Sequence, residues 1–325
     1  MKVTILDDYF DTLRTLPSFA KLNDFEVTIF NDHMEDIPEL VDRLMDTDVL
    51  VLVRERTSIT GELLDQLPNL KMISQRSIYP HVDVEACTRN GVLFCSNMQA
   101  PALSYAAAEL TFGLILAALR QIPQNMAALQ QGTWQFGVGD TLYGKTLGIY
   151  SYGRLGSIVA GYGKAFGTRV MVYGGTASCE RARQDGFEIA ESREQFFSES
   201  DIISLHTRLT PETRGMVTAA DLALMKPDSL LVNTARAGLI EEYALVNGLN
   251  ASRPGMAAVD VFEQEPVLNG DHPLLHMPNT VCTPHVGFVT NQEFDIQFSD
   301  IYDQVVAYAN GDPINVINPE VMASP

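Results

Sequence analysis

Basic residues are scarce in this chain of 325 residues. It holds 22 lysines and arginines against 41 aspartates and glutamates, which gives a formal net charge of −19 at pH 7. Nucleic acids and anionic membrane surfaces bind proteins through basic stripes that release counterions. We therefore expect neither a nucleic acid nor a membrane as partner, and an anionic substrate would need local arginines.

Cysteines and long apolar runs are also rare. The four cysteines show no C-x-x-C spacing and lie in or beside apolar runs, which indicates reduced thiols in a cytoplasmic protein without a metal site. The most apolar stretch, about 102–119, contains Glu109 and does not reach a clean membrane span, so we expect a buried helix. The strand pattern at the first residues argues against a signal peptide.

Two α/β units are expected from the order of apolar runs. Residues 1–98 alternate five short apolar runs with helical stretches, which is typical of a parallel sheet. Residues 99–288 begin with a long helical segment over 101–131 and continue with six further strand patterns. The last helix, about 291–310, follows the second set and would return to the first.

These patterns predict an α/β protein of two doubly wound parallel-sheet domains. The first is a flavodoxin-like substrate domain made of residues 1–98 and 289–325. The second, residues 99–288, is a Rossmann domain that binds a dinucleotide. We expect the active site in a cleft between them.

The dinucleotide prediction rests on residues 144–156, GKTLGIYSYGRLG. A short apolar strand runs there into a tight turn and then a helix, whose free amides and positive dipole end suit a pyrophosphate. The match to G-x-G-x-x-G has serine at the first position, and Gly153 and Gly156 at the other two. The same turn without a ligand is the alternative.

We expect the cofactor to contact this turn and the ends of the neighbouring strands. The residues concerned are Ser151, Tyr152, Gly153, Arg154, Leu155, Gly156, Gly174, His206, Thr234, Ala235 and Asp260.

Three polar residues follow later strand patterns of the second unit and form a chemical set. Arg236 can hold a substrate carboxylate with two hydrogen bonds. His285 can give a proton to the adjacent carbonyl oxygen, and Glu265 can orient the imidazole and stabilise its protonated form. Beside a nicotinamide, this set reduces a 2-keto acid to a 2-hydroxy acid. Taken singly, each could be an ordinary surface or buried residue.

The chain resembles the D-isomer-specific 2-hydroxyacid dehydrogenases, including the D-3-phosphoglycerate dehydrogenase-like branch. The resemblance covers nearly the whole chain and rests on LGIYSYGRLG, SLHTRLTPETRGMV, MKPDSLLVNTARAGLIEE, AAVDVFEQEP and NTVCTPHVG, in the family's order. It implies that Arg236 binds the substrate carboxylate and that Glu265 and His285 are the proton-transfer dyad. It also implies a homodimer built around the nucleotide domain.

Two departures from the family pattern affect the substrate and the cofactor. The loop QRSIYPHVD lacks the family's glycines, so we expect Arg76 and Ser77, together with Arg54 after the third strand, to contact the substrate. The second strand of the nucleotide domain ends in Tyr-Gly-Gly, without the acidic residue that grips the ribose of NAD. The cofactor is therefore NAD or NADP, and a dinucleotide-sensing protein without activity is the alternative function.

Overall fold

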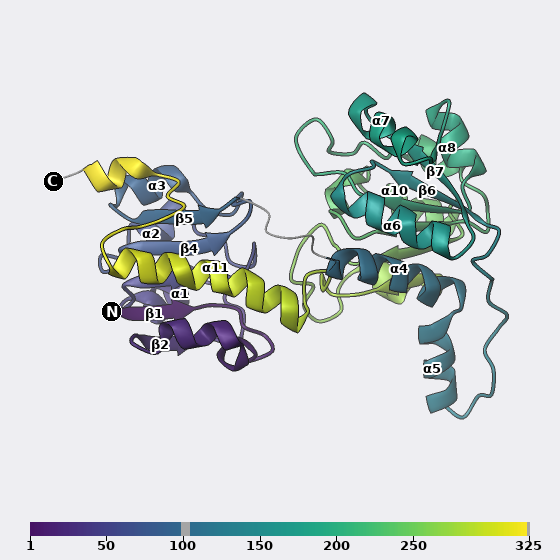
Figure 1. The fold of residues 1–325 in the computed structure, drawn as a ribbon. Helices are drawn as coiled ribbons and strands as arrows, with labels where there is room; N and C mark the ends of the chain where they lie inside the picture. The colour runs from purple at the N-terminus through teal and green to yellow at the C-terminus, as the bar shows by residue number, and fades with distance from the viewer. Residues whose placement is uncertain (99–104, 324–325) are drawn as a thin grey trace. The chain divides into compact units, whose positions relative to one another are not determined.

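The computed structural model describes residues 1–98 and 105–323 of the chain. The chain divides into unit 1, Met1–Leu103 with Val289–Pro325, and unit 2, Ser104–Phe288. Figure 1 shows both units, coloured along the chain. The expected boundary after residue 98 falls at the edge of the described part, because residues 99–104 lie outside it.

Unit 1 contains a five-stranded sheet in the order β2-β1-β3-β4-β5, in which every neighbouring pair is parallel. The strands are β1 (Lys2–Ile5), β2 (Glu26–Ile29), β3 (Val49–Val51), β4 (Met72–Arg76) and β5 (Leu93–Asn97). This order is that of flavodoxin-like sheets. All five expected strands are present, because each is a short apolar run that can be buried between helices.

Helices cover this sheet, and the last of them arrives from the far end of the chain. They are η1 (Leu13–Thr15), η2 (Pro17–Leu22), α1 (Ile37–Leu44), α2 (Gly61–Leu64), α3 (Val84–Arg89), α11 (Asn291–Ala309) and η5 (Pro319–Ala323). Figure 1 shows α11, in yellow, running along the sheet. Its Gln304 is fully buried and donates to Ser74 Oγ at 3.0 Å and to the Gln75 carbonyl at 2.9 Å. The expected return of this helix to the first sheet is confirmed.

Unit 2 contains a seven-stranded parallel sheet in the order β12-β11-β10-β9-β6-β7-β8. The strands are β6 (Thr146–Tyr150), β7 (Arg169–Tyr173), β8 (Glu188–Ile189), β9 (Ile202–Leu205), β10 (Leu230–Asn233), β11 (Met256–Val259) and β12 (Thr280–Cys282). From β6 the chain adds β7 and β8 on one side of the sheet, and then adds β9 to β12 on the other side of β6. The direction of strand addition therefore reverses between β6 and β9. Ligands of doubly wound sheets bind at such a point.

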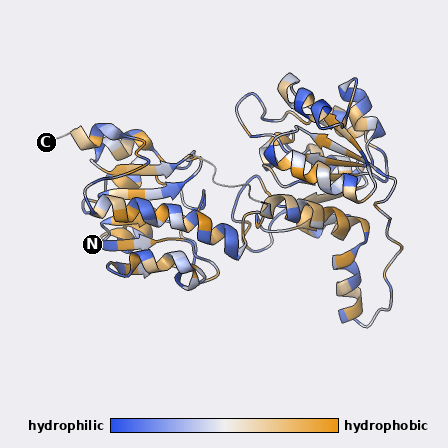
Figure 2. Ribbon diagram, viewed as in Figure 1, coloured by the Kyte–Doolittle hydropathy of each residue, from blue (hydrophilic) through white to orange (hydrophobic). Residues whose placement is uncertain are grey.

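The two-residue strand β8 is the strand of unit 2 that the sequence pattern missed, because a run so short carries no periodicity. The helices of this unit are α4 (Ala106–Leu119), α5 (Ile122–Gln130), α6 (Arg154–Ala165), α7 (Thr176–Gln184), α8 (Arg193–Glu199), α9 (Ala219–Leu224), η3 (Ala237–Leu239), α10 (Ala244–Asn250) and η4 (Pro273–His276). The central strands are mainly apolar, as the orange ribbon in Figure 2 shows. The expected fold class, two parallel α/β sheets, is confirmed.

The expected helix over 101–131 is wrong in its continuity. Residues 101–104 lie outside the described part, and the remainder is broken into α4 and α5. Gln121 between them has a left-handed φ of 51°. Pro123 in the first turn of α5 has no backbone N–H, so it cannot extend the hydrogen-bond pattern of α4. Within the described residues, no single helix has the length and apolarity of a membrane span; α4 and α5 meet that test only together, with a bend of 60°.

Candidate active site

The turn after β6 has the shape that the glycine pattern predicts, although serine fills its first position. Ser151 adopts a left-handed φ of 77°, the conformation for which glycine is usually needed. Gly153 caps α6, and a Cβ built there meets no described heavy atom within 4 Å. A Cβ at Gly156 would lie 2.4 Å from the Ser151 carbonyl oxygen. The first glycine leaves open space for a ligand, and the second allows the helix to pack on the turn.

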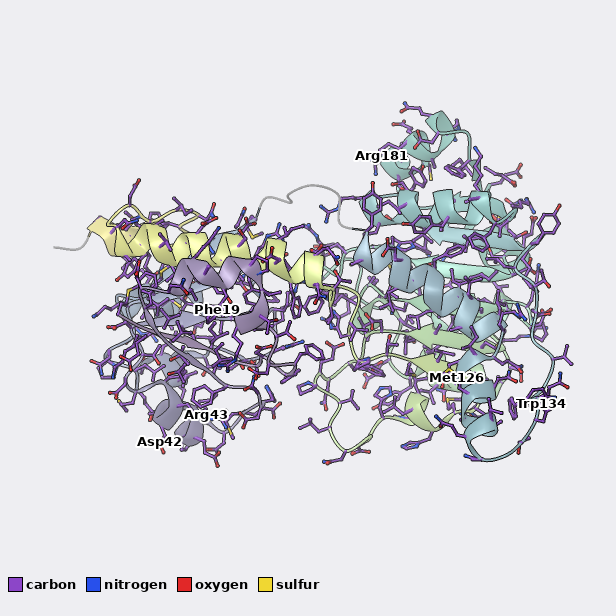
Figure 3. All side chains as sticks on the ribbon, turned by 60° about the horizontal axis from the view of Figure 1, so that its bottom comes forward. Phe19, Asp42, Arg43, Met126, Trp134 and Arg181 are labelled. Atoms are coloured by element: carbon purple, nitrogen blue, oxygen red, sulfur yellow. The ribbon has the colours of Figure 1, made fainter. Side chains whose placement is uncertain are left out.

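Residues from β7 and α7 brace this turn. The amide of Ser151 donates to the Tyr173 carbonyl at 2.7 Å, and the amide of Tyr152 donates to Ser178 Oγ at 2.5 Å. Arg181, labelled in Figure 3, donates to the Tyr152 carbonyl at 3.0 Å. Gly174 lies against the turn, since a Cβ there would be 3.3 Å from the Ser151 Cα. The bracing by Ser178 and Arg181 was not predicted, because it joins side chains of a helix to backbone groups of a distant turn.

Other expected cofactor residues follow β9 and β10. His206 comes after β9, and its Nε2 lies 2.9 Å from Ser204 Oγ. Burial lowers the pKa of His206 to about 4, so this imidazole is neutral at pH 7. Thr234 follows β10 and its hydroxyl lies 2.6 Å from the hydroxyl of Thr111 on α4. Ala235 donates its amide to Asn233 Oδ1 at 3.0 Å. These positions are at the carboxyl edge of the sheet, and their contacts with a cofactor stay predictions.

The two residues expected to transfer the proton form a direct pair. His285 Nδ1 lies 2.5 Å from Glu265 Oε2, and the second carboxylate oxygen accepts the amide of Phe262 at 2.8 Å. The side chains are partly open to solvent, with 26% of His285 and 31% of Glu265 exposed. Because Nδ1 faces the carboxylate, Nε2 is the nitrogen of this ring that can meet a substrate.

The charges at the pair fix the ionisation of Glu265. Burial raises its pKa, but the hydrogen bond and charge of His285, the Phe262 amide and the charge of Arg236 lower it, and the net shift is downward. Glu265 is thus a carboxylate at neutral pH. The influence of Arg236 also shows that its guanidinium lies near the pair. Arg236 stands between β10 and η3, and its Nη1 donates to the Ala235 carbonyl at 2.7 Å.

Asp260, expected at the cofactor, holds the loop that carries His285. Its fully buried carboxylate accepts from Thr283 Oγ1 at 2.6 Å and from the amides of Val286 and Gly287 at 2.8 and 2.9 Å. Burial raises the pKa of Asp260, whereas these three hydrogen bonds and the charge of His285 oppose the rise. Sequence reasoning missed this support, because the only local sign of it is an acidic residue after a buried strand.

The three residues expected at the substrate lie in unit 1. Arg54 and Ser77 follow β3 and β4 and both have left-handed backbones, with φ of 60° and 80°. Arg76 is 8% exposed, and its Nε lies 2.9 Å from Asp300 Oδ2 on α11. This ion pair gives Arg76 a structural role, and the contact of all three with a substrate stays a prediction.

Comparisons with known proteins identify the family of this chain. Residues 112–287 match the model of the D-isomer specific 2-hydroxyacid dehydrogenase, NAD binding domain. A glyoxylate reductase of Aeropyrum pernix is 37% identical over 295 residues, which cover 87% of this chain and 86% of that protein. The chain belongs to this family. A crystal structure of a phosphoglycerate oxidoreductase from Vibrio cholerae O395 superposes on the dehydrogenase with a TM-score of 0.91, at 44% identity and over 96% of this chain and 99% of that one.

Several relatives are longer. A D-3-phosphoglycerate dehydrogenase of Methanocaldococcus jannaschii is 38% identical over 86% of this chain, but the matched part is 53% of that protein. The chain therefore spans about half the length of such relatives. The family match shows a dinucleotide-binding domain, as expected. Two solved structures at 26% identity hold a dinucleotide: a D-lactate dehydrogenase of Aquifex aeolicus is complexed with NAD and lactic acid, and an acyclic imino acid reductase is complexed with NADPH and D-Arg.

We predict that Gly153→Val abolishes dinucleotide binding and leaves the fold intact. The backbone φ of −97° suits valine and nothing described obstructs its Cβ, but its methyl groups would occupy the space of the pyrophosphate. Isothermal titration with NADH should show an affinity at least about a hundredfold weaker, with little change in Tm.

Gly161→Val on the same helix is the matched control, because its Cβ also meets no described atom within 4 Å. It should bind NADH like the wild type. Wild-type affinity in a folded Gly153→Val protein would remove the turn from the nucleotide site.

Proposed function

We propose that this protein is an NAD(P)-dependent D-2-hydroxyacid dehydrogenase acting on a small 2-keto acid or D-2-hydroxy acid. The observation that supports the proposal best is the pair of His285 Nδ1 and Glu265 Oε2, 2.5 Å apart, at the same sheet edge as the glycine turn. An imidazole held in this way by a carboxylate, with an arginine close by, is suited to proton transfer beside a carboxylate-bearing substrate.

In the proposed reaction Arg236 holds the substrate carboxylate and orients the neighbouring carbonyl. When bound, a reduced nicotinamide would supply the hydride for the carbonyl carbon. The proton on His285 Nε2 passes to the carbonyl oxygen, which becomes the hydroxyl of the product. Glu265 keeps the ring oriented and stabilises its protonated form. In the oxidation direction the neutral imidazole takes the hydroxyl proton.

A screen of 2-keto acids for consumption of NADH and NADPH tests this function. The first substrates to test are glyoxylate for reduction and D-3-phosphoglycerate for oxidation, because relatives are named as a glyoxylate reductase and a D-3-phosphoglycerate dehydrogenase. Turnover that is lost in His285→Ala supports the proposal. Tight dinucleotide binding without any turnover would favour the alternative, a dinucleotide-sensing protein, for which the altered loop after β4 is the motivating feature.

We predict opposite pH profiles for the two directions. Reduction needs the imidazolium of His285, so kcat/KM should fall as pH rises; oxidation needs the neutral ring and should rise over the same range. The lowered pKa of Glu265 keeps this carboxylate ionised throughout the neutral range. Glu265→Gln removes the carboxylate that orients the ring and stabilises its protonated form, so the pH at which kcat/KM for reduction falls should move lower.

The control for this experiment is Glu263→Gln, because Glu263 pairs with another imidazole, that of His272, at 2.9 Å. Its profile should match the wild type. Identical profiles for the wild type and Glu265→Gln would refute the dyad.

We predict little preference between the two cofactors, or a tilt toward NADPH, since β7 ends at Tyr173 and Gly174 follows it, so no carboxylate stands there. The measurement is the ratio of kcat/KM for NADPH and NADH. Gly175→Asp places a carboxylate at the N-cap of α7, in open space, and should lower this ratio about tenfold or more.

Gly175→Asn has the same shape without the charge and should leave the ratio near the wild-type value. A wild-type preference for NADH above about a hundredfold, roughly 2.7 kcal/mol, would contradict the prediction.

We further propose a homodimer formed through an apolar arm of unit 2, defined as α5 and the following loop to residue 143. No residue of α5 is buried, and the helix projects from the body of the unit in Figure 1. Figure 3 labels Met126 and Trp134 on this arm. Trp134 is 78% and Val138 94% exposed. Monomers rarely expose so many large apolar side chains together, so a second copy of the chain is the occupant we propose.

We predict that Trp134→Glu together with Val138→Glu yields monomers in sedimentation velocity, because charges in a buried contact are costly. Leu268→Glu, at a side chain that is 57% exposed elsewhere in unit 2, should leave the dimer intact. A monomeric wild type would end this proposal.

We also propose a cytoplasmic location. All four cysteines are free, and free thiols are typical of reducing compartments.

A further inference from the structure

Serine occupies the first position of the turn after β6, where the dinucleotide fingerprint has a glycine that makes the turn tight. The φ of Ser151 is 77°, in the left-handed region that a residue with a Cβ adopts only at a cost. Such a backbone persists where the surrounding structure holds it in place. The contacts around Ser151 therefore show what replaces the missing glycine.

Two anchored peptide groups hold the backbone of Ser151. Its own amide donates to the Tyr173 carbonyl on β7 at 2.7 Å. The next amide, that of Tyr152, donates to Ser178 Oγ on α7 at 2.5 Å. The φ and ψ angles of a residue are set by the orientations of the two planar peptide groups beside it. Because both groups are bonded to atoms outside the turn, Ser151 cannot leave the left-handed region without breaking a hydrogen bond.

Helix α7 contacts Tyr152 at three points along its length. Ser178, near the start of the helix, accepts the Tyr152 amide, and Arg181 donates to the Tyr152 carbonyl at 3.0 Å. Asp185, at the end of the helix, accepts from the Tyr152 hydroxyl at 2.7 Å. Ser178 and Tyr152 are 7% and 4% exposed, so water has little access to replace these bonds. We call the contacts of Ser178 and Arg181 with Tyr152 the brace.

The brace acts on the helix terminus that is expected to bind the pyrophosphate. The first amides of α6 have no acceptor within the helix, and a Cβ at Gly153 meets no described heavy atom within 4 Å, so an anion has room beside them. The Ser151 carbonyl oxygen packs against the same helix, since a Cβ at Gly156 would collide with it. A change in the Ser151 backbone would therefore displace the first turn of α6 and its amides.

A direct contact of Arg181 with a cofactor phosphate is the competing explanation, because guanidinium groups bind phosphates. Arg183, two residues later on α7, carries the same charge. Its exposed guanidinium has no hydrogen-bond or ion-pair partner in the described part of the chain. The two arginines thus differ in whether they bond to the turn, and this difference allows the two explanations to be separated.

We propose that Ser178 and Arg181 are positioning residues for the dinucleotide. They hold Ser151 in the left-handed backbone that a glycine would adopt unaided, and the affinity of the turn for a pyrophosphate depends on them. The inference rests on the proposed function, in which a dinucleotide binds at this turn. It implies a coupling: the brace is needed while residue 151 is serine, and loses most of its effect when residue 151 is glycine.

A double-mutant cycle between Ser178 and Ser151 tests the inference, with the Kd of NADH as the readout. Ser178→Ala should weaken NADH binding about tenfold in the wild-type background. In the Ser151→Gly background the same change should weaken it less than about threefold, because glycine keeps the turn without the brace. Tm confirms that each variant is folded. Equal losses in the two backgrounds would refute the inference, since Ser178 would then act independently of residue 151.

Arg181→Gln separates the brace from a direct phosphate contact, and it leaves no buried amide unpaired. It should weaken NADH and NADPH by the same factor, about fivefold, and less in the Ser151→Gly background. Arg183→Gln is the matched control, because it removes the same charge from the same helix; it should bind both cofactors like the wild type. A loss confined to NADPH, or an equal loss in Arg183→Gln, would overturn the inference, because phosphate contact or net charge would explain it.

The titrations need no turnover, so the inference and the proposed function can fail separately. A protein that shows the predicted coupling in NADH binding but reduces no 2-keto acid would lose the proposed function and keep the inference. Unchanged NADH affinity in folded Ser178→Ala and Arg181→Gln variants would overturn the inference, while the dehydrogenase function would stand.

Discussion

The buried carboxylate of Asp260 is the interaction on which the proposed chemistry depends. It accepts hydrogen bonds from a hydroxyl and two backbone amides of residues 283–287. This loop carries His285, whose backbone has a left-handed φ of 52°. A flexible loop would leave the imidazole free to turn away from Glu265. Glu265 follows β11 and His285 follows β12. Because these two strands are neighbours in the sheet, their carboxyl ends place the two side chains close together. The sheet thus supplies the geometry, and one desolvated carboxylate makes it rigid.

The same sheet edge explains how so acidic a chain can bind anions. Acidic side chains pair with lysines and arginines elsewhere in unit 2, as Glu188 and Glu199 do with Arg169. Arg181 instead donates to the carbonyl of the glycine turn. Local positive charge and free helix amides therefore act at the site, whereas the net negative charge resides on the remaining surface.

How much of this could be read from the sequence depends on the range of the interactions. The longer strands and the strand-to-helix turn are local features, since each is set by a few consecutive apolar residues or by small residues in a turn. The break at Gln121 was missed because the left-handed backbone of a glutamine leaves no compositional sign. The bracing of Tyr152 by Ser178 and the ion pair of Arg76 with Asp300 were missed because they join distant parts of the chain.

The loop after β4 takes a left-handed backbone without a glycine. Ser77 adopts a left-handed φ of 80°, and its amide donates to the Asn97 carbonyl at 3.0 Å. Glycine would take this conformation without cost, so the serine must be stabilised by its surroundings. Gln75 and Ser96 provide that support, since both bond to the Ser77 carbonyl. Because the support comes from buried residues of the sheet, the exposed positions of the loop can vary without loss of its backbone shape.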